Sequence, residues 1–147
     1  MRKIALIVCA FAAALLIASP ITTGKSKPKP KQLHAALSGS EEAPSGTGDP
    51  DGYGAAFLEV QGRNICFRII AKQISPATAG HIHKGDVGQD GPISVPLFTG
   101  NVPSKRKCVK ASSNSVAKDI RRNPGDYYVN VHTADFPDGA IRGQLTK

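Results

Sequence analysis

The stretch Tyr-Tyr-Val-Asn-Val-His-Thr at residues 127–133 decides the fold, because apolar and polar side chains alternate along it. Side chains of a β-strand point alternately to its two faces. Tyr127, Val129 and Val131 therefore form an apolar face, and His132 lies on the opposite face with the remaining side chains. A strand with one apolar face packs that face against a core, so this segment is predicted to form the wall of a β-structure.

Similar short runs occur along the rest of the chain, separated by Gly, Pro, Asp and Ser. They lie at residues 33–37, 53–60, 65–71, 79–83, 93–97 and 140–146. The only helix expected spans 115–122, with Ser113 or Asn114 as its N-cap. Many short strands with almost no helix predict an all-β fold, a Greek-key β-sandwich or small barrel of about seven or eight antiparallel strands.

Two histidines stand two residues apart on one of these strands. Ile82 is expected to point into the core, so His81 and His83 point together to the outer face. A neighbouring strand can bring His132 beside them, and neutral imidazole suits copper, zinc, iron and nickel. The pattern predicts a metal site outside the wall, roofed by the loops at 84–92 and 134–139. The alternative is that the histidines share a polar surface by chance.

The same alternation assigns the other candidate site residues. Leu33, Ala35 and Leu37 are expected to face inward, which leaves His34 outward as a candidate fourth ligand. Inward-facing positions on the last strand leave Arg142 outward. We expect Arg142, together with Asp135 in the second roof loop, to surround the ligands rather than to bind the ion.

The N-terminus is typical of an export signal. Arg2 and Lys3 precede an apolar run at residues 4–18, which is shorter than the roughly 20 residues that span a bilayer. We therefore expect a cleaved signal peptide at 1–24, a Lys/Pro linker at 25–31 and one domain at 32–147, with an uncleaved anchor as the alternative. The mature protein is expected to be periplasmic, at the cell surface or secreted, with no stable membrane insertion.

Charge and cysteine usage agree with an exported domain. Six of the 19 Lys and Arg residues precede residue 32, which leaves 13 basic against 11 acidic residues. We expect no nucleic-acid partner, because such a balance provides no basic stripe. Cys66 and Cys108 are expected to form a disulfide, worth roughly 4 kcal/mol for a loop of about 43 residues. Two free buried thiols are the alternative.

Three blocks of the sequence together resemble the CHRD domain, the module repeated in chordin and found singly in exported bacterial proteins. The resemblance spans nearly all of residues 32–147 and implies a β-sandwich. The blocks are Leu-Ser-Gly-Ser-Glu-Glu-Ala-Pro at 37–44, Ala-Gly-His-Ile-His-Lys-Gly at 79–85, and residues 125–145 from Gly-Asp-Tyr-Tyr to Arg-Gly-Gln-Leu.

A weaker similarity links the histidines to the copper ligands of Cu/Zn superoxide dismutase. It implies copper at His81, His83 and His132, with Arg142 near the metal to guide an anion. No histidine lies between His83 and His132, so the metal-bridging histidine and the zinc ligands have no counterparts. We therefore expect no zinc site, and a copper site completed by His34, water or a carboxylate.

Three functions follow as hypotheses. The first is an exported protein that binds a copper-like ion through the histidines. The second is an envelope or extracellular interaction module that binds a protein partner and no metal. The third is a redox enzyme of the superoxide dismutase type, and we expect binding rather than catalysis.

Overall fold

The computed structural model describes residues 29–147, so the expected signal peptide and most of the linker lie outside the described residues. In this part of the chain, eight strands accompany one α-helix, α1 (Asn114–Arg122), and two 3₁₀ turns, η1 (Gly39–Glu41) and η2 (Pro124–Asp126). The strands are β1 (Lys31–Ser38), β2 (Tyr53–Gln61), β3 (Asn64–Lys72), β4 (Ala77–Lys84), β5 (Ile93–Thr99), β6 (Lys107–Lys110), β7 (Tyr127–Thr133) and β8 (Ile141–Gln144). None of the described helices is long and apolar enough to cross a membrane.

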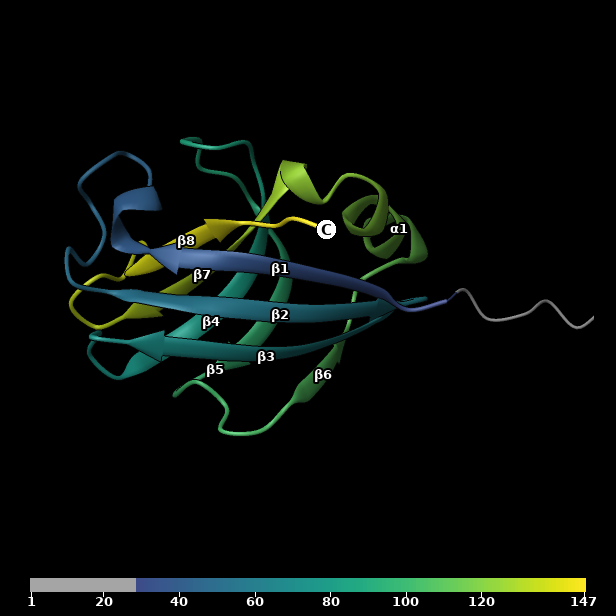
Figure 1. Cartoon of the computed structure of the whole chain (residues 1–147), viewed down its shortest axis with the longest axis horizontal. Helices are drawn as coiled ribbons and strands as arrows, with labels where there is room; N and C mark the ends of the chain where they lie inside the picture. Colours follow the sequence, from purple (N-terminus) through teal and green to yellow (C-terminus); the bar gives the residue numbers. More distant parts are fainter. Residues whose placement is uncertain (1–28) are drawn as a thin grey trace, which may run out of the picture.

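All eight strands belong to one antiparallel sheet, in the order β5-β4-β7-β8-β1-β2-β3-β6. The sheet curls until its end strands β5 and β6 approach each other, which makes a nearly closed barrel (Figure 1). The rings of Phe67 on β3 and Phe98 on β5 stack in the interior with their centroids 6.3 Å apart. The all-β prediction is confirmed, and the form is a curled barrel rather than two separate sheets.

The alternation seen in the sequence places the core correctly. Leu33, Ala35 and Leu37 are each 2% exposed, and Ile82 is fully buried. Apolar side chains from the other strands fill the same interior, among them Val129, Val131, Ile141 and Leu145. Burial of these side chains on one side of the sheet leaves the other side of β4, β7 and β8 for the polar residues that concern function.

The predicted helix is present and begins one residue earlier than expected. The Ser113 hydroxyl accepts a hydrogen bond from the Val116 backbone N–H at 3.2 Å, so Ser113 is the N-cap. Ala117 and Ile120 are buried and attach the helix to one end of the barrel. The opposite face of α1 therefore stays available to solvent.

One strand, β6, was missed by the sequence analysis. Its sequence Lys-Cys-Val-Lys is short and mostly exposed, and it pairs with β3 at the edge of the sheet. Cys66 and Cys108 are directly opposite each other in this pairing, with Cα atoms 3.9 Å apart, and form the expected disulfide. The disulfide fastens the edge strand to the barrel.

Candidate metal centre

Strands β4 and β7 are neighbours, and their register decides which histidines meet. His81 is opposite Asn130 and His83 is opposite Tyr128, whereas His132 is opposite Ala79. His132 is therefore a diagonal neighbour of His81 on the same face, within reach of a long or aromatic side chain. On the β5 side, the pairing of β4 shifts just before His81 and again just before His83. Such irregularities adjust the direction of side chains.

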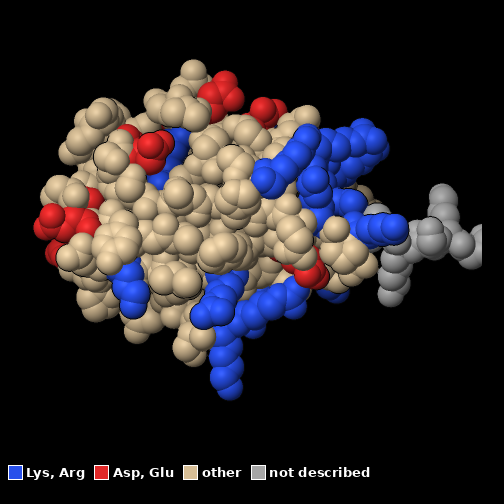
Figure 2. All heavy atoms as spheres, in the orientation of Figure 1, with Lys and Arg blue, Asp and Glu red and all other residues tan. Residues whose placement is uncertain are grey.

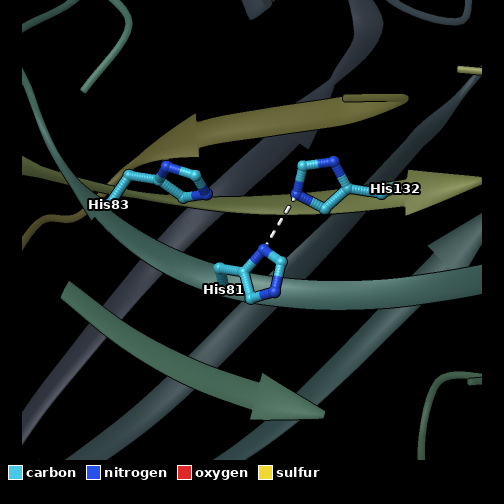
Figure 3. Close-up of side chains that lie close together, drawn as sticks. All are labelled: His81, His83 and His132. Carbon is cyan, nitrogen blue, oxygen red and sulfur yellow. Dashed lines mark hydrogen bonds between the residues drawn. The ribbon is translucent and has the colours of Figure 1, made fainter. Parts of the chain in front are cut away.

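The three imidazoles converge on the outer face, as the sequence predicted (Figure 3). The ring centroids of His81 and His132 are 4.9 Å apart, and that of His83 lies 5.5 Å from His81 and 6.0 Å from His132. One ring nitrogen from each residue lies within 4.8 Å of the other two. The three rings therefore meet in space, which the shared outer face of one strand did not by itself require.

Backbone carbonyls orient two of the rings. The Nδ1 atom of His83 is 2.9 Å from the Gly91 carbonyl oxygen, and the Nδ1 atom of His132 is 3.0 Å from the Pro137 carbonyl oxygen. A carbonyl oxygen only accepts, so each Nδ1 carries the proton and each Nε2 carries the lone pair. The Nε2 atom of His83 is buried and has no hydrogen-bond partner. Metal-binding histidines are commonly held in this way.

The His81 ring contacts the His132 ring directly. His81 Nδ1 lies 3.0 Å from His132 Nε2 (Figure 3). Because His132 Nε2 is the acceptor, His81 Nδ1 carries the proton in this arrangement. If that proton moves to the other nitrogen of His81, both facing nitrogens are free to bind a cation.

All three histidines favour the neutral form that binds metals. Burial, followed by the effect of charge on His132 and His83, lowers the pKa of His81 to about 4. Burial also lowers the pKa of His83 and of His132, although their hydrogen bonds to Gly91 and Pro137 oppose the shift. The cluster is therefore uncharged at neutral pH, and no proton has to be displaced from a cationic ring.

The roof over this face is made by the loops, as expected. The chain at 84–92 folds back tightly enough that a Cβ on Gly91 would lie 1.6 Å from the Lys84 carbonyl oxygen. This close approach requires glycine, and it brings the Gly91 carbonyl to His83. The second roof loop supplies the Pro137 carbonyl, so both loops hold a histidine.

Arg142 and Tyr128 were expected on the outer face, and both lie there, but each is only 1% exposed. The Arg142 guanidinium donates hydrogen bonds to the carbonyls of Asp86 and Gln89, each at 2.8 Å. Its Cζ lies 3.4 Å from the Tyr128 ring centroid, and the Tyr128 ring stacks on His83 at 4.9 Å. Arg142 therefore holds the loop and supports His83 through Tyr128.

A small pocket of ≈ 290 Å³ opens beside the cluster, lined by His83, Asp90, Tyr128, Asn130 and Asp138 among others. Asn130 Nδ2 donates to Glu42 Oε2 at 3.3 Å, and Glu42 is 4% exposed. Burial raises the pKa of Glu42 to about 7, against the opposing charge of Arg142. The Glu42 carboxyl group is therefore buried against Asn130, the residue opposite His81 in the β4–β7 pairing.

Two predicted residues lie outside the cluster. His34 is exposed on β1, where its backbone pairs with Phe57 on one side and Thr146 on the other. The Asp135 carboxylate accepts a hydrogen bond from Ser75. The histidine rings are instead held by the backbone carbonyls of Gly91 and Pro137, a role that was expected for Asp135. The sequence analysis also missed Glu42 and Asn130, although Asn130 shares the His132 face in the alternating pattern.

Comparisons with known proteins agree with the architecture. The family model described as the CHRD domain matches residues 33–145. This range contains all three clustered histidines and all eight strands, apart from the first two residues of β1. This is an extracellular type of domain. Comparisons with curated proteins and with solved structures found no significant match. The chain therefore belongs to the CHRD domain family.

Proposed function

We propose that this exported domain binds a copper-like transition-metal ion through His81, His83 and His132. The observation that carries the proposal is the convergence of three neutral imidazoles on one point. Two of them have their Nδ1 proton held by a backbone carbonyl, so that a lone pair remains for the metal. The buried, unpartnered Nε2 of His83 has no other evident role.

The spacing of the nitrogens suits a small cation after a modest adjustment. Metal–imidazole bonds of about 2.0–2.1 Å place nitrogens roughly 3–3.5 Å apart in a tetrahedral or related site. His81 Nδ1 and His132 Nε2 already stand 3.0 Å apart. His83 would have to move inward by about 1 Å, because the ligand atoms are spread over at most 4.8 Å. Copper is favoured because its affinity for nitrogen ligands is the highest of the first-row divalent ions.

The chain offers a matched control for the test. Cu(II) is titrated into the mature protein and into His83→Ala and His132→Ala, with His34→Ala as a control from the exposed fourth histidine. The cluster variants are expected to lose at least tenfold in affinity, and the Cu(II) electron paramagnetic resonance spectrum should lose nitrogen couplings. The His34→Ala protein should behave as the unaltered protein. Equal uptake by all four proteins would overturn the proposal.

A second candidate function, the interaction module, is supported by an exposed apolar area on the outer face of β2 and β3. Tyr53, Phe57 and Ile70 are 52%, 51% and 37% exposed. The pairing of β2 with β3 places Ile70 opposite Ala55, between Tyr53 and Phe57 on the same face. Exposed apolar side chains in one area are typical of protein-binding surfaces. A partner captured from the envelope by the intact protein but not by Phe57→Ser, with or without a chelator, would favour this function.

The third hypothesis, a redox enzyme, stays a prediction. Arg142 was expected to guide an anion, but the residue is only 1% exposed and its guanidinium donates hydrogen bonds to loop carbonyls. No feature of the described residues specifically favours catalysis over binding. Measurement of superoxide consumption by the copper-loaded protein would test it directly.

A further inference from the structure

A second site lies at the end of the barrel that carries α1. A pocket of ≈ 680 Å³ runs between the helix, the start of β1, the β2–β3 turn and the C-terminal segment. Five basic residues line it together with Gly62 and Asn114, and no acidic residue does. Figure 2 shows Lys and Arg side chains gathered at this end of the molecule. The basic residues are Lys31, Lys118, Arg121, Arg122 and Lys147.

The acidic side chains nearest along the same elements are engaged elsewhere. Asp119 accepts hydrogen bonds from Lys84, Tyr127 and Asn123, and it lines a neighbouring pocket rather than this one. Glu59 of β2 pairs with Arg106 and Gln32. The pocket therefore keeps its positive charge, although residues 32–147 as a whole are nearly balanced at 13 basic and 11 acidic residues.

Arg121 is held in place in this pocket by a hydrogen bond to the backbone. Its Nη2 donates to the Lys29 carbonyl oxygen at 2.9 Å, which ties the segment before β1 to the helix. Its Nε is buried and has no hydrogen-bond partner in the described chain. The contact with Lys29 fixes the Arg121 guanidinium beside the pocket that it lines, and guanidinium groups bind phosphate oxygens through charge-assisted hydrogen bonds.

We propose that this pocket binds a multiply charged phosphate ligand. Five like charges in one cavity repel each other, and a ligand of high negative charge density relieves that repulsion. A carboxylate brings one negative charge, whereas a phosphomonoester brings nearly two and three acceptor oxygens for Lys and Arg. The volume lies in the range of small-ligand sites, so it accommodates several linked phosphates. The ligand is either a free oligophosphate or phosphate groups presented by a lipid surface.

The test uses inorganic tripolyphosphate as the free ligand and vesicles containing phosphatidic acid, whose headgroup is a phosphomonoester, as the surface, with phosphatidylcholine vesicles as the neutral reference. Binding to the mature protein is measured by calorimetry and by co-sedimentation. The pocket variant carries Lys118→Glu and Arg122→Glu, both at exposed positions. The control carries Lys105→Glu and Lys107→Glu, which change the net charge equally at exposed positions outside the pocket.

We expect the pocket variant to bind at least about tenfold more weakly, since two ion pairs become two repulsions, while the control changes less than about threefold. Tripolyphosphate binding would identify a free ligand, and binding to phosphatidic acid vesicles alone would identify a surface. Equal weakening in both variants would show that only net charge matters and would overturn the site. Failure of both phosphate probes to bind the unaltered protein would overturn it as well. Matching melting temperatures for the three proteins serve as the check on folding.

Discussion

Acidification should weaken metal binding much less here than at an ordinary cluster of three histidines. A proton competes with the metal for each imidazole, so affinity falls once pH drops below the pKa. Three histidines at the usual value of 6.5 would each lose about tenfold between pH 7.5 and 5.5, or about a thousandfold together. The pKa of His81 is about 4, so this residue stays neutral and contributes almost no loss.

The other two histidines of the cluster set an upper limit on the expected loss of metal affinity. The pKa values of His83 and His132 are also lowered, so each loses less than the tenfold of an ordinary histidine. The total loss between pH 7.5 and 5.5 should therefore stay below about a hundredfold. It is measured by competition with a chelator whose own protonation is known, in a buffer that does not bind copper. Titration of the imidazole protons by nuclear magnetic resonance in the metal-free protein gives the individual values independently.

The His34→Ala protein should give the same pH profile, because His34 lies outside the cluster. A loss of a thousandfold or more would show that the three rings protonate as solvent-exposed histidines do. That result would contradict the burial of the cluster and, with it, the explanation of why the rings are ready to bind a cation.

Three further perturbations test the fold. Replacing Cys66 and Cys108 by serine should lower the free energy of unfolding by roughly 4 kcal/mol in a denaturant titration. The reason is that a covalent link no longer joins two residues 42 positions apart in the unfolded chain. A loss under about 1 kcal/mol would argue against that constraint. Folded Glu42 holds a proton that the unfolded chain releases, so stability should fall by up to about 3 kcal/mol as pH rises from 4.5 to 7. Glu42→Gln should remove this fall, and identical pH profiles for the two proteins would show that the carboxyl is not perturbed. Ser113→Ala should cost about 1 kcal/mol through loss of the N-cap, and an unchanged melting temperature would count against the Val116 hydrogen bond.

The sequence alone determined the wall of the barrel and the direction of its histidines. Strand alternation is a local property of the backbone, so the inward position of Ile82 already required His81 and His83 to point outward. Short-range signals narrowed the helix cap to Ser113 or Asn114, and cysteine usage indicated the disulfide. Strand β6 was not predicted because it has four residues, two of them lysines, and no apolar face. Only its pairing with β3 makes it a strand.

Only the tertiary structure decided what surrounds the histidines and where charge collects. The carbonyls of Gly91 and Pro137, which orient two rings, belong to loops whose path depends on packing against the barrel. Arg142 and Glu42 became buried because those loops and the segment after β1 cover the outer face. The basic pocket unites residues from 31 to 147, and a count of charges along the chain cannot reveal that grouping. Side-chain direction is set within two residues, whereas burial and electrostatic potential depend on segments that meet only after the chain has folded.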